Sequence, residues 1–313
     1  MSDIGIVIVT YNSQAEIGAC LDAALATGAD VIVIDNRSQD GTLAEVASRG
    51  CRVLANQENR GFAAAVNQGF RAFDSPYVLL LNPDAVILGG LDALRQACDL
   101  PGAAGAGGCL IGDDGKPQTG FMVRSFPTPA ALVLELLVLN RIWENNPFNR
   151  HYRSKDVDCS VRTAVEQPAG AFLMVRRAVW QEVGGFDEGY FPLWFEDVDF
   201  CRRVADCGYV FIYTPEAVAR HAGGHSITSL DLRARSFYWY RSLLRYSVRH
   251  YRPFAFRTVC LAVVMGAILR GAVGALSERR WTPLAAYGNV ARLAGHCLLF
   301  GWEEAAATPR AGF

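Results

Sequence analysis

The first 110 residues alternate short apolar runs with stretches that have helical spacing. The clearest apolar runs are Ile4–Val9, Val31–Ile34 and Tyr77–Leu81, which are four to six residues long. Continuous apolar strands of this length suit a parallel sheet that is covered on both faces. Alternation with helices is typical of βαβ units. We therefore predict an α/β domain with a Rossmann-like, mostly parallel sheet flanked by helices.

Polar residues follow each of these apolar runs. Thr10-Tyr11-Asn12 comes after the first, Asp35-Asn36 after the second and Asn82-Pro83-Asp84 after the third. Open α/β sheets bind ligands beyond the carboxyl ends of their strands. Asp35 ends a buried strand and needs a partner, which a base N–H or a ribose hydroxyl would supply. Asn36 and Ser38 equally fit a simpler role as turn formers and helix caps.

Two common ways of binding phosphate are missing from the chain. No GxGxxG follows the first strand, which disfavours NAD chemistry, and no P-loop pattern is present. A divalent metal is the usual substitute for a glycine cradle. The net charge is −1, which gives no reason to expect a nucleic acid as a partner.

Two adjacent carboxylates stand out in the second half of the chain. Glu196 and Asp197 begin a helical pattern directly after Trp194-Phe195. The helix dipole favours acidic residues in a first turn, and an i,i+4 pair with Arg203 explains Asp199. Neither effect explains why Glu196 and Asp197 follow an aromatic run.

Taken in order, four segments resemble the family 2 glycosyltransferases, which are inverting enzymes of the GT-A fold. The resemblance covers roughly residues 3–230. It implies a GT-A domain over 1–230, with a nucleotide-binding half over 1–110 and an acceptor half over 111–230. The four segments are Val9-Thr10-Tyr11-Asn12, Asp35-Asn36-Arg37-Ser38-Gln39-Asp40-Gly41-Thr42, Leu81-Asn82-Pro83-Asp84 and Phe195-Glu196-Asp197-Val198-Asp199-Phe200.

The resemblance also implies a donor site with a divalent cation, Mg²⁺ or Mn²⁺. Asp84 would bind the cation together with His221, and His225 is the reserve choice. The family usually has an Asp-x-Asp motif here, and this chain departs from it at Asn82. Asn67 fits helix packing on sequence alone, and only the resemblance places it in the nucleotide pocket. The residues implied for the nucleotide-sugar are Thr10, Tyr11, Asn12, Asp35, Asn59, Arg60, Gly61, Asn67, Asn82 and Asp84.

Inverting glycosyl transfer needs a base that takes the proton of the acceptor hydroxyl. By resemblance we nominate Asp197 as this base, with Glu196 as the second choice or as a group that orients the acceptor. Trp194 would stack on a sugar face. Gly170 and Ala171 would permit close approach of a sugar, although close backbone packing explains them equally well.

The donor and acceptor are predicted less sharply. The Asn-Pro-Asp variant, the run Gly170–Arg177 and the tail look like bacterial rhamnosyltransferases of cell-wall and surface-polysaccharide assembly. This implies dTDP-L-rhamnose as donor and a polyprenyl-diphosphate-linked sugar or polysaccharide as acceptor. The alternatives are a transferase that uses a UDP-sugar (galactofuranosyl or N-acetylhexosaminyl) and a non-catalytic nucleotide-binding scaffold on the same fold.

Residues 231–313 are predicted to be a helical region. Seven arginines and no acidic residue lie between Arg233 and Arg257, and Arg241, Arg245, Arg249 and Arg252 share one helical face. Thr258–Leu269 is apolar but has only 12 residues, which is too short for a comfortable membrane span. The pattern fits a segment lying on an anionic membrane surface. It fits equally a helical pair that docks on the domain or forms a dimer interface.

Cysteines and the N-terminus bear on the compartment. Nine cysteines occur without a CxxC pair, which favours a reduced cytosolic setting. The chain opens on a strand pattern rather than on a signal peptide. We expect a cytoplasmic protein that is peripheral at the inner face of the cell membrane.

Overall fold

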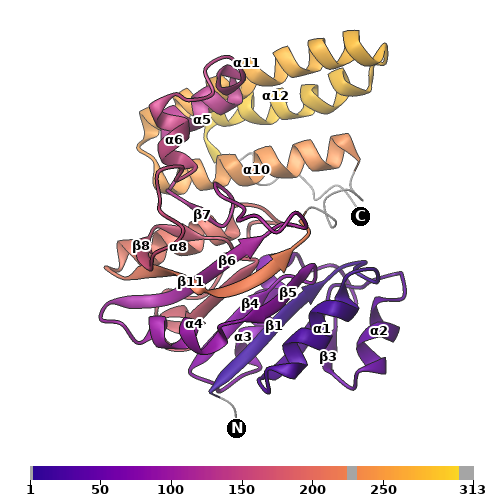
Figure 1. Ribbon diagram of the computed structural model, residues 1–313. Coiled ribbons are helices and arrows are strands. Elements are labelled where there is room, and N and C mark those ends of the chain that lie inside the picture. The colour runs from indigo at the N-terminus through magenta and orange to yellow at the C-terminus, as the bar shows by residue number, and fades with distance from the viewer. Residues whose placement is uncertain (1–2, 224–230, 303–313) are drawn as a thin grey trace. The chain divides into compact units, whose positions relative to one another are not determined.

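The computed structural model describes residues 3–223 and 231–302 (Figure 1). The chain divides into two units. The first comprises Met1–Phe126, Arg153–Pro192 and Glu196–Ser229, and the second comprises Pro127–Tyr152, Leu193–Phe195 and Leu230–Phe313. The second unit therefore takes in two segments from the middle of the chain in addition to the C-terminal region.

The first unit is built on a nine-stranded mixed sheet in the order β3-β2-β1-β4-β10-β6-β11-β5, in which β8 also pairs with β11. Strands β3, β2, β1 and β4 are parallel, whereas β10 runs antiparallel to β4 and β6. The predicted α/β sheet is confirmed, with the antiparallel pairs confined to the later strands. The strands are β1 (Ile4–Thr10), β2 (Asp30–Asp35), β3 (Arg52–Ala55), β4 (Tyr77–Leu81), β5 (Ala85–Gly89), β6 (Ala103–Ile111), β8 (Thr163–Val165), β10 (Phe172–Arg176) and β11 (Val210–His221).

Alternate side chains of β1 face opposite sides of the sheet. Ile4, Ile6 and Ile8 belong to one buried cluster, and Val7 and Val9 belong to another. The helices fall on the two faces accordingly, and both faces are covered, as the apolar strands predict. Helices α1 (Ile17–Ala26), α2 (Thr42–Ser48) and α4 (Leu91–Cys98) cover the first face, and α3 (Phe62–Arg71), α7 (Arg177–Glu182) and α8 (Glu196–Asp206) cover the second (Figure 1).

A tight turn follows β6 and sends the chain back along that strand. Gly112 and Lys116 close the turn with a backbone hydrogen bond of 2.9 Å, and Gly115 has a positive φ of 73°. A positive φ suits glycine because it carries no Cβ. Ile111 then forms an antiparallel bridge with Pro117. The returning chain then contributes β7 (Val123–Arg124), which pairs with the later strand β9 (Gln167–Pro168) in a two-stranded antiparallel sheet.

The second unit is helical. Its longest helix, α11, packs on both α5 and α12. Gly266 allows the contact with α5, because a Cβ there would stand 2.1 Å from the carbonyl oxygen of Leu136. Arg270 donates to the carbonyls of Glu135 and Leu136 at the end of α5. The elements are α5 (Pro129–Leu136), a 3₁₀ turn (Leu139–Arg141), α6 (Pro147–Tyr152), α10 (Leu232–His250), α11 (Pro253–Glu278) and α12 (Thr282–Phe300).

Helix α11 corrects one expectation from the sequence. It has 26 residues rather than 12, and among the described residues it is the helix long and apolar enough to cross a membrane. Arg270, which the sequence pattern places at the end of the apolar segment, lies inside the helix. Its guanidinium donates a hydrogen bond to the carbonyl of Glu135 at the end of α5. Within its most apolar 18 residues, 39% are buried in the structure, so length and composition alone are weak evidence for a span.

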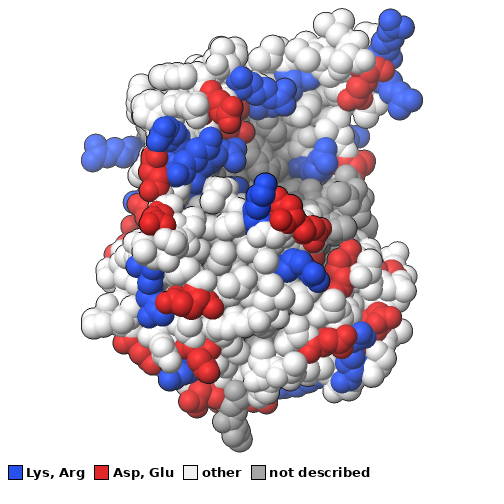
Figure 2. Space-filling model, in the orientation of Figure 1, with Lys and Arg blue, Asp and Glu red and all other residues white. Residues whose placement is uncertain are grey.

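The exposed side of α11 is apolar. Figure 2 shows largely uncharged side chains along the upper edge of the helical unit, whereas acidic and basic side chains are interspersed over the first unit. Phe254 is 84% exposed near the start of α11, and Trp281 is 82% exposed just after its end. We call the following set the α11 apolar face: Phe254, Leu261, Met265, Ile268, Leu269, Val273 and Leu276.

Candidate active site

The ends of β1 and β2 are joined by the side chains that the sequence singles out. Thr10 and Asp35 are register partners in the parallel pair, and the Thr10 hydroxyl donates to Oδ1 of Asp35 at 2.8 Å. Ser38 donates to the same carboxylate through its hydroxyl at 2.5 Å and its backbone N–H at 2.9 Å. Asp35 is fully buried. The hydrogen-bond partners of Asp35 thus come from the chain itself. Its burial therefore no longer requires a ligand, and its contact with a nucleotide stays a prediction.

Hydrogen bonds join the turn after β1 to the turn after β2. Asn12 has a positive φ of 52°, a conformation that asparagine adopts more readily than most residues. Its side-chain oxygen accepts from the backbone N–H of Gln39 at 2.7 Å, and its own N–H donates to Ser38 Oγ at 2.9 Å. Tyr11, the residue between Thr10 and Asn12, is half-buried. The two polar segments therefore form one continuous rim.

Residues 59–61 lie beside the same rim. The Asn36 side chain donates to the carbonyl of Gly61 at 3.1 Å, and Asn59 Oδ1 accepts from the N–H of Gly61 at 2.9 Å. Gly61 has a φ of 84°, and a Cβ there would stand 3.2 Å from the carbonyl oxygen of Pro192. The backbone geometry therefore requires glycine at this position, while the Arg60 side chain is exposed.

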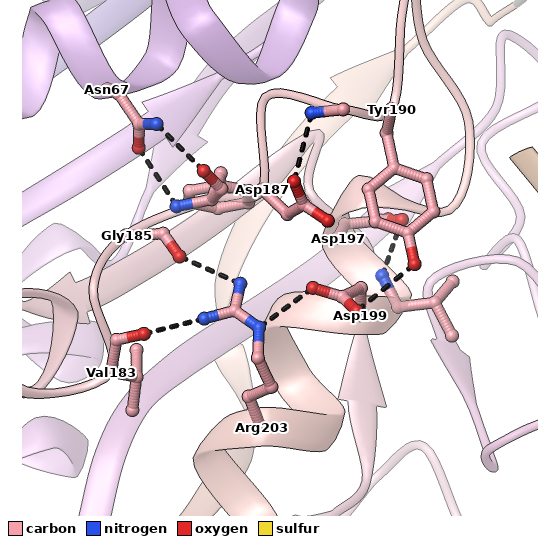
Figure 3. A network of polar contacts seen from close by, with 11 residues as sticks. Asn67, Val183, Gly185, Asp187, Tyr190, Asp197, Asp199 and Arg203 are labelled. Carbon is pink, nitrogen blue, oxygen red and sulfur yellow. Dashed lines mark hydrogen bonds and ion pairs between the residues drawn. The ribbon is translucent and has the colours of Figure 1, made fainter. Parts of the chain in front are cut away.

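Asn67 has a structural role. It is 2% exposed in the middle of α3, and both polar atoms of its amide are used. Its nitrogen donates to the carbonyl of Phe186 at 2.8 Å, and its oxygen accepts from the N–H of Phe186 at 2.9 Å (Figure 3). The nitrogen also donates to Glu188 at 3.0 Å. An amide with this set of partners has little left to offer a ligand. The structure therefore favours helix packing over the nucleotide contact that the family resemblance implies.

Asp84 and His221 face each other. Asp84 Oδ1 lies 3.5 Å from Nε2 of His221, and Oδ2 accepts from the N–H of Gly223 at 3.1 Å. The pairing of β11 with β5 sets this contact, since His221 is the register partner of Ala85. Burial alone would raise the pKa of Asp84, but the hydrogen bond and charge of His221 and the Gly223 N–H outweigh it and lower the pKa. Asp84 is therefore held as a carboxylate. His225 lies outside the described residues.

Asp197 lies in the first turn of α8 and is half-buried. Its Oδ1 accepts from the N–H of Val198 at 2.8 Å. Burial raises the pKa of Asp197 above its ordinary value, against the lowering effects of that N–H, of the Arg124 charge and of the Gly170 N–H. A raised pKa is what a carboxylate needs to act as a general base near neutral pH.

Glu196 is more deeply buried than its neighbour. It is 6% exposed, and its Oε2 has no hydrogen-bond partner among the described residues. Burial and then the negative charge of Asp197 raise the pKa of Glu196 well above its usual range. Two adjacent carboxyl groups with raised pKa values are therefore present at one helix start. Such perturbed groups concentrate at functional sites.

A three-residue segment, residues 169–171, connects the two aspartates. The backbone N–H of Asn82 donates to the carbonyl of Ala171 at 3.0 Å, which ties the Asn82–Asp84 turn to this segment. Gly170, in the middle of this segment, lies against Asp197, because a Cβ at Gly170 would stand 3.5 Å from the Cβ of Asp197. Asp84 and Asp197, more than a hundred residues apart in sequence, therefore lie at the same edge of the sheet.

A buried ion pair holds α8 in place. Arg203 donates to Asp199 Oδ2 at 2.8 Å, and also to the carbonyls of Val183 and Gly185 at 2.7 and 2.8 Å (Figure 3). Asp199 is fully buried, and its other oxygen accepts from the Tyr190 hydroxyl at 3.1 Å. The i,i+4 pair predicted from the sequence is confirmed. It anchors the helix whose first turn carries Glu196 and Asp197.

Comparisons with known proteins identify the family of the chain. The family model described as "Glycosyl transferase family 2" matches residues 5–179, which is more than half of the chain. The chain belongs to glycosyl transferase family 2. A second model, "Glycosyl transferase family group 2", matches residues 141–303. The predicted family is confirmed, and the protein is a glycosyltransferase.

Two curated relatives of this glycosyltransferase are rhamnosyltransferases by name. The chain is 32% identical to the N-acetylglucosaminyl-diphospho-decaprenol L-rhamnosyltransferase of Mycobacterium tuberculosis (strain CDC 1551 / Oshkosh), over 80% of this chain and 90% of that protein. It is 31% identical to rhamnosyltransferase WbbL of Escherichia coli K12, over 61% and 69% of the two chains.

A solved structure supports the GT-A fold. Mannosyltransferase PcManGT from Pyrobaculum calidifontis, in complex with GDP-Man and Mn²⁺, aligns with a TM-score of 0.51. It is 19% identical and covers 96% of this chain and 88% of that chain. This likeness concerns the fold alone.

Residues 118–124 of this glycosyltransferase lie beside the candidate site, although no sequence motif marks them. This segment follows the tight turn after β6, and Gln118 and Phe121 both contact His221, while Arg124 lowers the pKa of Asp197. The only sequence signal is the turn after β6. It predicts that the chain reverses direction but not which residues the returning segment contacts. Trp194 belongs to the second unit, and its contact with a sugar stays a prediction.

Proposed function

We propose that the protein transfers L-rhamnose from dTDP-L-rhamnose to a polyprenyl-diphosphate-linked sugar, with inversion at the anomeric carbon. The observation that carries this proposal is the common edge shared by Asp84 and Asp197, joined through Gly170 and Ala171. An inverting transfer needs a donor-binding group and a proton acceptor on two sides of one sugar. The names of the relatives support rhamnose and a lipid-linked acceptor.

In this proposal Asp197 is the general base. The acceptor hydroxyl donates a hydrogen bond to the Asp197 carboxylate and loses its proton to it as the oxygen attacks the anomeric carbon. The bond from that carbon to the nucleoside diphosphate breaks, and the diphosphate leaves with the electron pair. Burial and the charge of Asp197 raise the pKa of Glu196, and in its protonated form Glu196 would orient the acceptor as a hydrogen-bond donor.

The donor would occupy the rim formed by Thr10–Asn12, Asp35 and residues 59–61. Asp84 and His221 offer one carboxylate and one imidazole to a divalent cation, and no cluster of three or more such ligands occurs in the described part of the chain. Two protein ligands fit a cation that keeps waters and phosphate oxygens. When bound, such a cation neutralises charge on the leaving diphosphate.

Asp84→Ala should weaken the binding of dTDP in the presence of Mn²⁺ by about tenfold or more, because the carboxylate ligand is lost. Without metal the affinity should change little. Calorimetric titration with dTDP, with and without Mn²⁺, measures both. Asp92→Ala, an exposed change on α4, serves as the control. Equal metal-dependent affinity in the wild type and the Asp84 variant would remove Asp84 from the cation site.

The donor is tested directly with a panel of sugar nucleotides. The acceptor would be a synthetic polyprenyl-diphosphate N-acetylglucosamine, and the donors dTDP-L-rhamnose, UDP-galactofuranose and UDP-N-acetylglucosamine. We expect turnover with the first donor only. Turnover with a UDP-sugar alone would favour that transferase class. Tight nucleotide binding without turnover of any donor would favour a non-catalytic scaffold.

We further propose that the α11 apolar face contacts an anionic membrane surface at the cytoplasmic side. The exposed arginines Arg257, Arg279 and Arg280 lie near the two ends of this face, where they could meet acidic headgroups while the apolar side chains enter the interface. The basic face that the sequence predicts on α10 is a weaker candidate, since Arg241 and Arg245 are half-buried and each has a partner.

The double substitution Met265→Glu with Ile268→Glu should lower binding to phosphatidylglycerol-containing vesicles by about tenfold or more, since two large apolar side chains no longer enter the interface. Co-sedimentation with vesicles measures this. Leu88→Glu, which places a carboxylate on an exposed position of β5, is the matched control. Unchanged vesicle binding would contradict the proposal, and loss of a dimer instead would assign the face to a second copy.

A further inference from the structure

Gln118 contacts two polar atoms of a single residue, His221. Its side-chain nitrogen donates to the backbone carbonyl of His221 at 2.9 Å, and its side-chain oxygen lies 3.0 Å from the ring nitrogen Nδ1. Gln118 is itself fixed, because its backbone N–H donates to the carbonyl of Leu110 at 2.8 Å at the end of β6. The His221 ring is also held on its face by Phe121, which stacks at 5.2 Å between centroids with planes 12° apart.

These contacts fix the tautomer of His221. A backbone carbonyl can only accept, so the amide nitrogen of Gln118 must face it, and the amide oxygen must then face Nδ1. Since an amide oxygen only accepts, Nδ1 carries the proton. The hydrogen positions are assigned from this network. In the neutral ring the lone pair is therefore on Nε2.

The Nε2 atom is the ring nitrogen that faces Asp84. It lies 3.5 Å from Oδ1, so a nitrogen lone pair and a carboxylate oxygen point into the same space. With the ring neutral these are two acceptors, and they can be joined either by a proton on Nε2, which makes the ion pair, or by a bound cation. The other oxygen of Asp84 is held by Gly223, which keeps the carboxylate turned toward the ring.

We propose that Gln118 is a positioning residue that presents Nε2 of His221 to the cation. The inference rests on the proposed cation site and adds to it a residue outside the strand-end motifs. Metal-binding histidines generally donate their second ring N–H to a neighbouring acceptor, and loss of that neighbour lowers metal affinity by about 10- to 100-fold. Gln118 supplies that acceptor here and fixes the ring through the backbone as well.

The first test is metal affinity. Gln118→Leu removes the acceptor and should weaken Mn²⁺ binding in the presence of dTDP by about tenfold or more, as measured by the electron paramagnetic resonance of free Mn²⁺. Gln118→Glu keeps an acceptor at Nδ1 but loses the donor to the His221 backbone carbonyl, so it should recover part of the affinity. Gln96→Leu, an exposed glutamine on α4, is the matched control. Mn²⁺ affinity unchanged in a folded Gln118→Leu variant would overturn the proposal.

The second test needs no variant of Gln118 and no metal. Nitrogen-15 spectra of the wild-type protein, with the His221 signals assigned by loss in His221→Gln, report which ring nitrogen carries the proton. We expect the Nδ1–H form, and an Nε2–H form would overturn the role of Gln118. If the wild type shows the Nδ1–H form but binds no Mn²⁺, the proposed cation site fails while the positioning of His221 stands.

Discussion

Asp197→Asn should lower turnover by about a hundred- to ten-thousand-fold, which is the usual contribution of a general base. The amide is nearly the same size and can keep the hydrogen bond from the N–H of Val198, but it cannot take the proton from the acceptor. Donor binding should stay within a few-fold of wild type, because the donor contacts lie elsewhere. Steady-state kinetics and dTDP titration measure the two quantities separately.

Two companion variants make this result specific. Asp206→Asn, an exposed change at the other end of α8, should leave turnover near wild type. Glu196→Gln should reduce turnover less than Asp197→Asn, since Glu196 is assigned to orientation. If Glu196→Gln proved the more damaging change, the base would be Glu196, and near-normal turnover of Asp197→Asn would remove Asp197 from the chemistry.

The same residue predicts a pH dependence. Burial raises the pKa of Asp197, and the positive charge of Arg124 and the neighbouring backbone N–H groups offset only part of this effect. Since the base must be deprotonated, kcat/KM should rise with pH through the raised pKa, at a pH above the ordinary range of an aspartate. The stability contribution of this carboxyl is full below its unfolded-state pKa and is lost as pH rises through the raised value. Asp197→Asn should therefore be more stable than wild type at neutral pH but not in acid.

Arg203→Ala should lower the free energy of unfolding by about 3–5 kcal/mol, the usual cost of removing one partner of a buried ion pair. Asp199 would keep its charge in a fully buried position, and the carbonyls of Val183 and Gly185 would lose their donor. The anchor of α8 would be lost with them. Urea unfolding of the full chain measures the change.

Arg202→Ala is the control for this change. Arg202 is the neighbour of Arg203 on α8. Its guanidinium pairs with Asp206 at 3.0 Å at the surface. Exposed pairs contribute about 1 kcal/mol or less, so this variant should be close to wild type. Equal losses for the Arg202 and Arg203 variants would mean that the buried pair does not anchor α8. Asp199→Asn in the Arg203→Ala background should recover part of the loss, because it removes the buried charge that Arg203 no longer balances.

The strand ends show which features of the fold and the candidate site the sequence predicts. The periodicity of Ile4–Val9 and its neighbours predicts a sheet covered on both faces, and the carboxyl-end rule then places Thr10, Asp35 and Asp84 at one edge. What the sequence could not show is the partner of each polar group. Asp35 is satisfied by Thr10 and Ser38, and Asn67 by a loop more than a hundred residues away.

The residues that the sequence missed act through tertiary contacts. Gln118 has no motif around it, and its role follows only from a turn that brings it back to Leu110 and from β11, which delivers His221 to the same place. The sequence pattern underestimates the length of α11 for a related reason. An arginine ends an apolar stretch in sequence, yet Arg270 is accommodated within the helix by the carbonyls of α5.

A crystal structure of the protein with Mn²⁺ and a non-transferable analogue of dTDP-L-rhamnose tests the shared edge most directly. We predict that the diphosphate lies beside Asp84 and His221, and that the sugar lies between them and Asp197, with the anomeric carbon open toward the Asp197 carboxylate. A donor bound away from Asp84, or a sugar turned away from Asp197, would contradict the proposed site.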